Sequence, residues 1–481
     1  MSHQELGGRP PEARTALGEP SGSFFLDGTG AARWPALAVA SVVLVLLATG
    51  VHLLGERSGG RALAFALGIG AVLGIVLQRS RFCFYCHARD YFERGDARGL
   101  LAIVAALAVG TLGMHVVMSG WLPVPQPGRL PPDAHIGPVS WALVLAGLAF
   151  GAGMVVSGSC ISAHWYRLGE GSPTAPFALA GAALGFVLGF NTWNPLYSAT
   201  IATAPVPWLP HHLGYAGSAA LQLAVLALAS ALLWRRLPPA RNAAAPASFG
   251  AALRALLQGR WPYVWGGLAV GAIAVIVVLR LRPLGVTAAL GSAARAAGEG
   301  QGLLPQRLEG LDGFAGCVTA VAQSLWQTPN ALLVGGLVAG AFAAALASGQ
   351  FRPAWPRPAQ VARGLGGGLL LGWGAMTGLG CTVGNLLSGT MAGALSGWVF
   401  GAAVLLAVWG RAQAAAGYLS GIPGPRISKH AFLLCAAPEP ALRSVLFSFL
   451  QQRTRDMGAR DFERQLLRAP MAARATRPTC W

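Results

Sequence analysis

Charged residues are scarce in this chain of 481 residues, where Asp, Glu, Lys and Arg together make up only 11%. Soluble domains carry about a quarter charged residues, so the shortage excludes an ordinary soluble protein. Hydrophobic residues reach 54%, and the mean hydropathy is +0.54. The composition therefore predicts an all-α polytopic membrane protein.

Lysine is almost absent, since Lys429 is the only one, and the net charge of +18 comes from arginine. The arginines lie between apolar stretches rather than in one patch, which argues against nucleic-acid binding. We therefore expect a chain that contacts the lipid bilayer and no nucleic acid.

Cysteine is also rare, and the 7 cysteines are too scattered for a disulfide scaffold. No Walker motif is present for ATP binding. The polar segment 1–33 lacks a signal-peptide pattern. We expect no cofactor, no metal site and no enzymatic activity.

About ten apolar stretches are long enough to span a membrane. They lie at about 34–54, 61–78, 99–119, 139–157, 174–190, 213–234, 262–280, 330–349, 362–378 and 393–411. These spans form a predicted transmembrane transport domain, 34–412. A polar N-terminal segment, 1–33, and a basic tail, 413–481, flank it.

The distribution of arginine predicts the orientation of the spans, because arginine favours cytoplasmic connections. Arginines cluster after the second and sixth spans: Arg79, Arg81, Arg89, Arg94 and Arg98, then Arg235, Arg236, Arg241, Arg254 and Arg260. The connection 120–138 holds only Arg129 against Asp133 and is predicted to face outward. Both termini are then cytoplasmic, and the expected location is the inner (plasma) membrane.

Two parts of the chain share one order of features: a span, a broken segment, two spans, a Gly-x-Gly run with a cysteine, and a last span. They cover about 61–190 and about 262–411. They start an odd number of spans apart, which gives them opposite orientations in the membrane. This pattern predicts an inverted repeat, with a site near the midplane where broken helices meet.

Three cysteines, Cys83, Cys160 and Cys381, lie at the breaks. Small residues around them allow helices to end and backbones to approach closely. A thiol is polarizable and forms weak hydrogen bonds, so three thiols suit a soft solute that moves through weak serial contacts. The alternative is that they are small packing residues, and the remaining break carries Gly285 and Thr287 instead.

Two further residues near the breaks are retained as accessory candidates. Cys86 forms a Cys-x-x-Cys with Cys83, a spacing found in redox pairs, although no thioredoxin-like strand–helix pattern surrounds it. His164 follows Cys160 closely and would tune a thiol or donate to an anion, unless it simply packs in the interior.

Arginines beside the breaks are predicted to attract an anion, since a guanidinium can hold an oxyanion with two hydrogen bonds. The set comprises Arg79, Arg81, Arg167, Arg280 and Arg282. Topology signalling and snorkelling to head groups are the alternative. That alternative does not account for Arg280 and Arg282, which fall on the predicted outer side.

Four ordered motifs mark the breaks. They read Arg79-Ser-Arg-Phe-Cys83-Phe, Gly151-Ala-Gly-Met-Val-Val-Ser-Gly-Ser-Cys160, Pro283-Leu-Gly-Val-Thr287, and Gly372-Trp-Gly-Ala-Met-Thr-Gly-Leu-Gly-Cys-Thr-Val-Gly384. Over roughly 60–412 the chain resembles the YeeE/YedE family of sulfur transport proteins. The resemblance implies inverted repeats and short broken helices. It also implies a narrow path where Cys83, Cys160 and Cys381 relay thiosulfate by sulfur-centred hydrogen bonds.

The resulting prediction is a transporter or channel that takes up a small sulfur-containing oxyanion, thiosulfate first. A cytoplasmic sulfur-carrier protein is a candidate partner. Three alternatives stay open: a membrane thiol–disulfide oxidoreductase using Cys83 and Cys86, a transporter of a related sulfur or selenium compound, and a structural subunit with inert cysteines.

Overall fold

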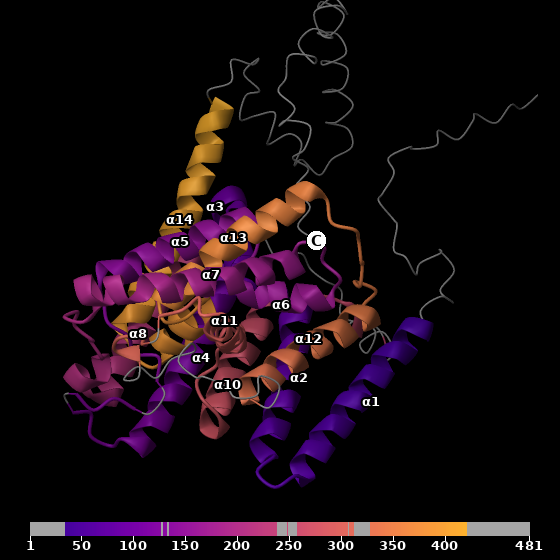
Figure 1. The fold of residues 1–481 in the computed structure, drawn as a ribbon, viewed down its shortest axis with the longest axis horizontal. Helices are drawn as coiled ribbons and strands as arrows, with labels where there is room; N and C mark the ends of the chain where they lie inside the picture. Colours follow the sequence, from indigo (N-terminus) through magenta and orange to yellow (C-terminus); the bar gives the residue numbers. More distant parts are fainter. Residues whose placement is uncertain are drawn as a thin grey trace, which may run out of the picture. The chain divides into compact units, whose positions relative to one another are not determined.

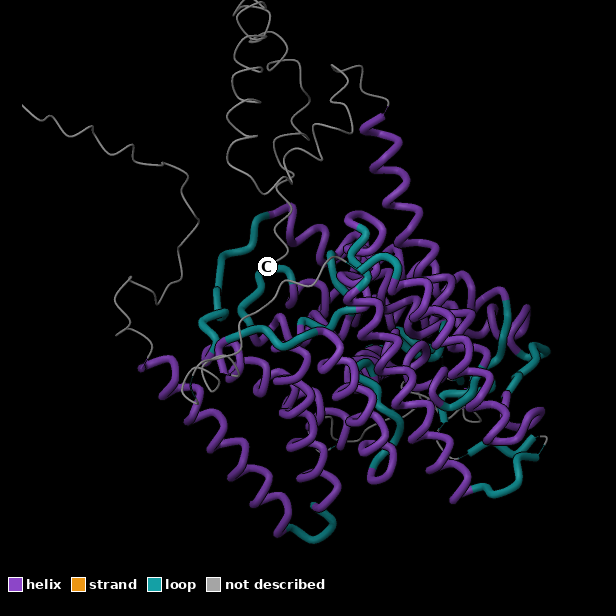
Figure 2. Tube along the Cα trace, turned by 180° about the vertical axis from the view of Figure 1, so that it is seen from behind, coloured by secondary structure: helices purple, strands orange, loops and turns teal. Residues whose placement is uncertain are grey.

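A computed structural model describes residues 34–126, 128–131, 134–237, 248, 257–305, 307–311 and 328–420. Figure 2 shows helices and loops, and no strand, in this described part of the chain. The elements in chain order are α1 (Trp34–Glu56), α2 (Arg61–Ser80), α3 (Phe84–Arg94), α4 (Arg98–Trp121), α5 (Trp141–Ser157), α6 (Ile161–Gly169), α7 (Ala175–Leu196), η1 (Tyr197–Ile201), α8 (Leu209–Trp234), α10 (Tyr263–Arg280), α11 (Ala288–Gly300), α12 (Pro329–Ala347), α13 (Pro358–Thr377), η4 (Thr382–Gly389) and α14 (Leu395–Ser420).

The described helices confirm the predicted multi-pass membrane protein. Of them, 9 are long and apolar enough to cross a membrane, or up to 10 if the bent pair α13–η4 counts as one span. Each predicted stretch coincides with one long helix. The last helix, α14, continues to Ser420, past its predicted end at 411, because alanine-rich sequence favours the helix. The predicted segment 1–33 and the tail from 421 onward lie outside the described residues.

Interrupted helices are the second confirmed feature. Helices α2 and α3 form one interrupted span, Arg61–Arg94, and α5 and α6 form another, Trp141–Gly169, whereas η4 is bent by 41° from α13. Positive φ angles mark three of the breaks, at Arg81 (54°), Gly158 (81°) and Leu379 (58°). A left-handed residue at a helix end cannot continue the hydrogen-bond ladder, so the helix stops there.

Each of the short helices α3, α6, α11 and η4 begins directly after a residue at a break. These residues are Cys83, Cys160, Thr287 and Cys381, and none of their side chains caps its helix with a hydrogen bond. The first N–H groups of a helix have no partner within the helix. The first N–H groups of these helices therefore lie close to these four side chains.

Close glycine contacts hold α2 against α12, two neighbouring helices in Figure 1. A Cβ atom at Gly70 or Gly74 would overlap the carbonyl group of Leu333 or Leu337. The spacing of four residues places both glycines on one helix face, a small-xxx-small pattern that lets membrane helices meet backbone to backbone. The sequence positions increase together on both helices, so α2 and α12 run parallel.

The same contact recurs between α4 and α10, where Gly267 and Gly271 face the carbonyls of Ala102 and Ala106. Helices α5 and α13 also pack together but run antiparallel. Gly374 lies against Ala146, whereas Gly153, later on α5, lies against 367–371, earlier on α13. Exchanging the two predicted repeats turns the first contact into the second and maps α5 onto α13. This packing is what an inverted repeat requires.

Candidate functional site

Two thiols meet where α3 and α6 begin. Cys83 Sγ lies 3.6 Å from Cys160 Sγ and 3.6 Å from Ser159 Oγ, and Cys160 Sγ lies 3.2 Å from Ser162 Oγ. Both cysteines are free and fully buried. We call Cys83 and Cys160 the thiol pair. The interruptions of α2–α3 and α5–α6 thus present two soft sulfur atoms side by side.

The other two breaks form a matching arrangement. Thr287, at the start of α11, lies beside Cys381, at the start of η4, and both are fully buried. We call Thr287 and Cys381 the mixed pair. Ser388 of η4 donates a hydrogen bond of 3.0 Å to the Leu284 carbonyl, which fixes η4 against the break before α11. Each repeat therefore contributes one pair.

A hydrogen bond links the two repeats at this place. The indole of Trp165, on α6, donates to the carbonyl of Val286, next to Thr287, at 3.0 Å. With the contacts within each pair, this bond connects all four breaks into one cluster. The sequence prediction that the broken segments meet agrees with these contacts.

The cluster combines helix starts with weak hydrogen-bond donors, a combination that suits an anion. A helix N-terminus carries a partial positive charge and unsatisfied N–H groups, and both stabilise an anion. The thiols and hydroxyls add weak donors, since S–H and O–H groups bind oxyanion oxygens and sulfur without a full charge. The arrangement can bind a small anion weakly and reversibly.

The accessory residue His164 is buried on α6. Its Nε2 lies 3.1 Å from Ser157 Oγ, and Ser157 Oγ donates to the Gly153 carbonyl at 2.8 Å. His164 is thereby anchored to the end of α5, next to the thiol pair. Its action on a thiol or an anion stays a prediction.

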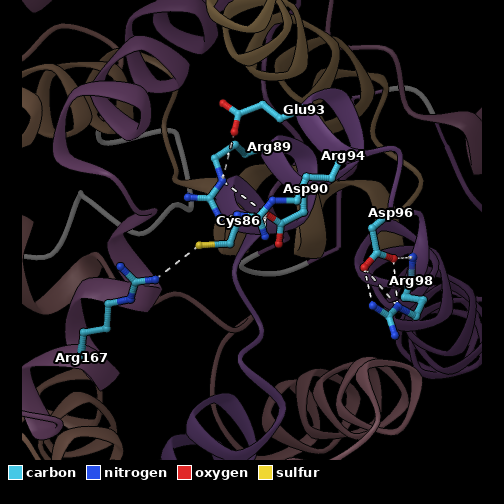
Figure 3. Close-up of polar contacts among 8 residues, drawn as sticks. All are labelled: Cys86, Arg89, Asp90, Glu93, Arg94, Asp96, Arg98 and Arg167. Atoms are coloured by element: carbon cyan, nitrogen blue, oxygen red, sulfur yellow. Dashed lines mark hydrogen bonds and ion pairs between the residues drawn. The ribbon is translucent and has the colours of Figure 1, made fainter. Parts of the chain in front are cut away.

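Cys86 has a charged neighbour, as Figure 3 shows: Arg167 Nη2 donates to Cys86 Sγ at 3.3 Å. The bond joins Cys86, about one helical turn after Cys83 on α3, to Arg167, about two turns after Cys160 on α6. Further along α3, Arg89 pairs with Asp90 at 2.7 Å, and its guanidinium lies over the ring of Tyr85. Arg167 is thus a predicted arginine that contacts the accessory thiol Cys86.

Arg81 takes part in a polar cluster of its own. Its Nη1 lies 2.9 Å from Glu170 Oε2, and its Nη2 donates to Gln350 Oε1 at 2.7 Å. Gln78 Nε2 donates to both Glu170 and Gln350, at 3.2 and 3.0 Å. This cluster ties together the ends of α2, α6 and α12. The Arg81 charge is therefore balanced by a buried carboxylate.

The remaining predicted arginines lie elsewhere. Arg79 is buried and donates to the Gly259 carbonyl. Arg280 and Arg282 are exposed at and just after the end of α10. Their attraction for an anion stays a prediction, as does that of Arg79, Arg81 and Arg167.

A small cavity of about 20 Å³ lies near the mixed pair, with room for about one water molecule. Its lining includes His135, Thr377, Asn385 and Ser396. Asn385 Nδ2 donates to the Gly378 carbonyl at 2.7 Å, which closes the turn that carries Cys381. The described residues hold no group of three or more His, Cys, Asp or Glu that could bind a metal.

Sequence reasoning did not identify Glu170, Gln78 or Gln350, or the cavity residues His135 and Asn385. Glu170 carried one signal that could have found it, since it is the single acidic residue in the sequence between Asp133 and Glu299. A buried carboxylate requires a partner, and the adjacent break offered Arg81. The others carry no distinctive spacing.

Interrupted helices that bring thiols and helix starts to one place characterise this multi-pass membrane protein. Residues 79–410 match the family described as Sulphur transport, and the chain belongs to that family.

Named relatives of the chain include transporters. The thiosulfate transporter TsuA of Escherichia coli (strain K12) is 27% identical over 353 residues, which is 71% of this chain and 91% of that protein. The thiosulfate transporter TsuA of Spirochaeta thermophila is 28% identical over 361 residues, 71% of this chain and 95% of that protein. The probable transporter YedE of Salmonella typhimurium is 28% identical over 142 residues, 30% of this chain and 32% of that protein.

Proposed function

We propose that this protein takes up a small sulfur-containing oxyanion, thiosulfate first, through a path lined by Cys83, Cys160 and Cys381. The observation that carries the proposal is the 3.6 Å contact between the Cys83 and Cys160 sulfur atoms at two helix starts. Membership of the sulphur transport family and the two relatives named as thiosulfate transporters support it.

The chemistry of the cluster matches such a solute. The helix starts attract its negative charge, and the thiols contact its terminal sulfur through soft, weak S–H hydrogen bonds. Neighbouring thiols allow one contact to form while another breaks. A solute held by several weak contacts can both enter and leave, which conduction requires.

The proposal includes a direction and a location. The chain lies in the inner membrane with both termini in the cytoplasm, and the exposed Arg280 and Arg282 collect the anion from the outer side. A cytoplasmic sulfur-carrier protein then receives the sulfur of the imported anion. The transported species is thiosulfate or a closely related sulfur or selenium oxyanion.

Growth of a sulfur-auxotrophic host on thiosulfate as its sole sulfur source tests the proposal. The host lacks its own thiosulfate importers and expresses either this chain, its Cys83→Ala variant or an empty vector. We expect growth with the unaltered chain and little or none with the variant, at equal amounts in the membrane. Growth no better than with the empty vector would reject the proposed function.

A further inference from the structure

Thr287 occupies the position that a cysteine holds in the other repeat. The packing symmetry maps α3 onto α11 and α6 onto η4, so Cys83 corresponds to Thr287 and Cys160 to Cys381. Each pair consists of the residues that precede two short helices of one repeat. The two pairs differ at one position, where Thr287 carries a hydroxyl and a methyl group and Cys83 carries a thiol.

The Thr287 hydroxyl is buried, with an exposed fraction of 0%, and lies against the Cys381 thiol without making a hydrogen bond of regular geometry to a described residue. It does not cap α11, although its residue stands at the capping position. Thr382, which follows Cys381, is 1% exposed, and its hydroxyl likewise makes no regular hydrogen bond to a described residue. A buried hydroxyl without a regular hydrogen bond is unfavourable, so two such groups beside one thiol leave two donors free for the acceptors of a ligand.

Another threonine at a helix start does cap its helix. Thr328 stands at the start of α12, and its hydroxyl accepts a hydrogen bond from the Ala331 N–H at 3.2 Å. That is the ordinary role of a threonine at a helix start. Thr287 has the same position on its helix without this bond, so helix capping does not explain it.

We infer that Thr287 and Thr382 bind the oxygen atoms of the transported anion beside Cys381. Their hydroxyls donate to the oxygens, the Cys381 thiol faces the sulfur end, and the N-termini of α11 and η4 stabilise the charge. The mixed pair is then an oxyanion subsite, whereas the thiol pair presents two sulfur atoms to the anion. This inference rests on the proposed function and specifies how that site selects an oxyanion.

The test measures KM and maximal rate of radiolabelled thiosulfate uptake, each normalised to folded protein in the membrane. Thr287→Val keeps the side-chain shape and removes the donor. We expect its KM to rise about tenfold or more, as for loss of a hydrogen bond to a charged group. Thr287→Ser retains the hydroxyl and should stay within about threefold of the unaltered chain, since the donor remains.

Thr328→Val is the matched control. It should lower the melting temperature, because a helix cap is lost, and leave KM unchanged. Thr382→Val carries the test if Thr287→Val does not fold, with the same expected rise in KM. An unchanged KM in a folded Thr287→Val protein would overturn the inference and leave the proposed function intact. Absence of thiosulfate uptake by the unaltered chain would overturn both.

Discussion

The thiol pair and the mixed pair occupy corresponding places in two inverted repeats, yet their surroundings differ. Beside Cys83 and Cys160 several side chains bond to one another, since Ser162 contacts a thiol and Arg167 donates to Cys86, although His164 Nδ1 and Tyr166 Oη make no hydrogen bond to a described residue. Beside Cys381 the groups without a regular hydrogen bond are the hydroxyls of Thr287 and Thr382. The repeats thus share a scaffold, while the residue at each helix start decides which chemistry that scaffold presents.

Replacing a sulfur by an oxygen should have the largest effect on transport. We expect Cys160→Ser and Cys381→Ser each to reduce thiosulfate uptake at least about tenfold, because serine is less polarizable and binds nearby backbone groups more tightly. Unfolding free energy should change by only about 1 kcal/mol. Uptake normalised to membrane protein measures the first effect. Near-normal uptake by both variants would return these cysteines to packing residues.

Near the thiol pair, Arg81 and Glu170 form a buried ion pair. The residues described near the mixed pair show no corresponding ion pair. Arg81→Gln should lower the unfolding free energy by about 3 kcal/mol, because the Glu170 carboxylate is left buried without its partner. Glu299→Gln is the control, since it breaks the exposed pair with Arg295, which contributes less than about 1 kcal/mol. Denaturant titration in detergent measures both. Equal losses would show that Arg81 and Glu170 do not stabilise the ends of α2 and α6.

Acid should lower the free energy of unfolding through His135, a residue of the cavity near the mixed pair. His135 lies in the connection between α4 and α5. Burial lowers the pKa of His135 to about 4, below an unfolded value of about 6.5. Its neutral form therefore stabilises the folded state fully above pH 6.5, and this contribution is lost as pH falls toward 4.

Between pH 7 and pH 5.5 we expect a loss of about 1 kcal/mol of unfolding free energy from His135. Denaturant titrations at the two pH values measure it, and His135→Gln should remove that part of the pH dependence. If the unfolding free energy of the variant fell by the same amount between the two pH values, the acid sensitivity would belong to other groups.

The smallest effect on uptake is expected at Cys86. Cys86→Ser should leave thiosulfate uptake within about twofold. Cys83 makes the contact with Cys160, whereas Cys86 accepts a hydrogen bond from Arg167 and is not part of that contact. Cys83→Ala, assayed in parallel, should lose most uptake. Equal losses in the two variants would instead favour thiol–disulfide chemistry at the Cys-x-x-Cys.

Hydropathy and small-residue runs were sufficient to predict the long helices and the breaks, because both features depend on local sequence. The order of the breaks then predicted the inverted repeat. The partners of Arg81 could not be predicted in this way, since Glu170 lies 89 positions away and Gln350 lies 269 away. The absence of a regular hydrogen bond at Thr287 is likewise a property of the folded cluster rather than of its neighbours in sequence.

The glycine contacts between α2 and α12 and between α4 and α10 have a consequence for motion. Each contact joins a helix of one repeat to a helix of the other, with carbonyls where a methyl group would not fit. Many transporters with inverted repeats work by rocking one half against the other. Here such rocking would have to separate the backbones of α2 and α12 and those of α4 and α10 at the same time. We therefore expect little relative motion between the two repeats along these contacts.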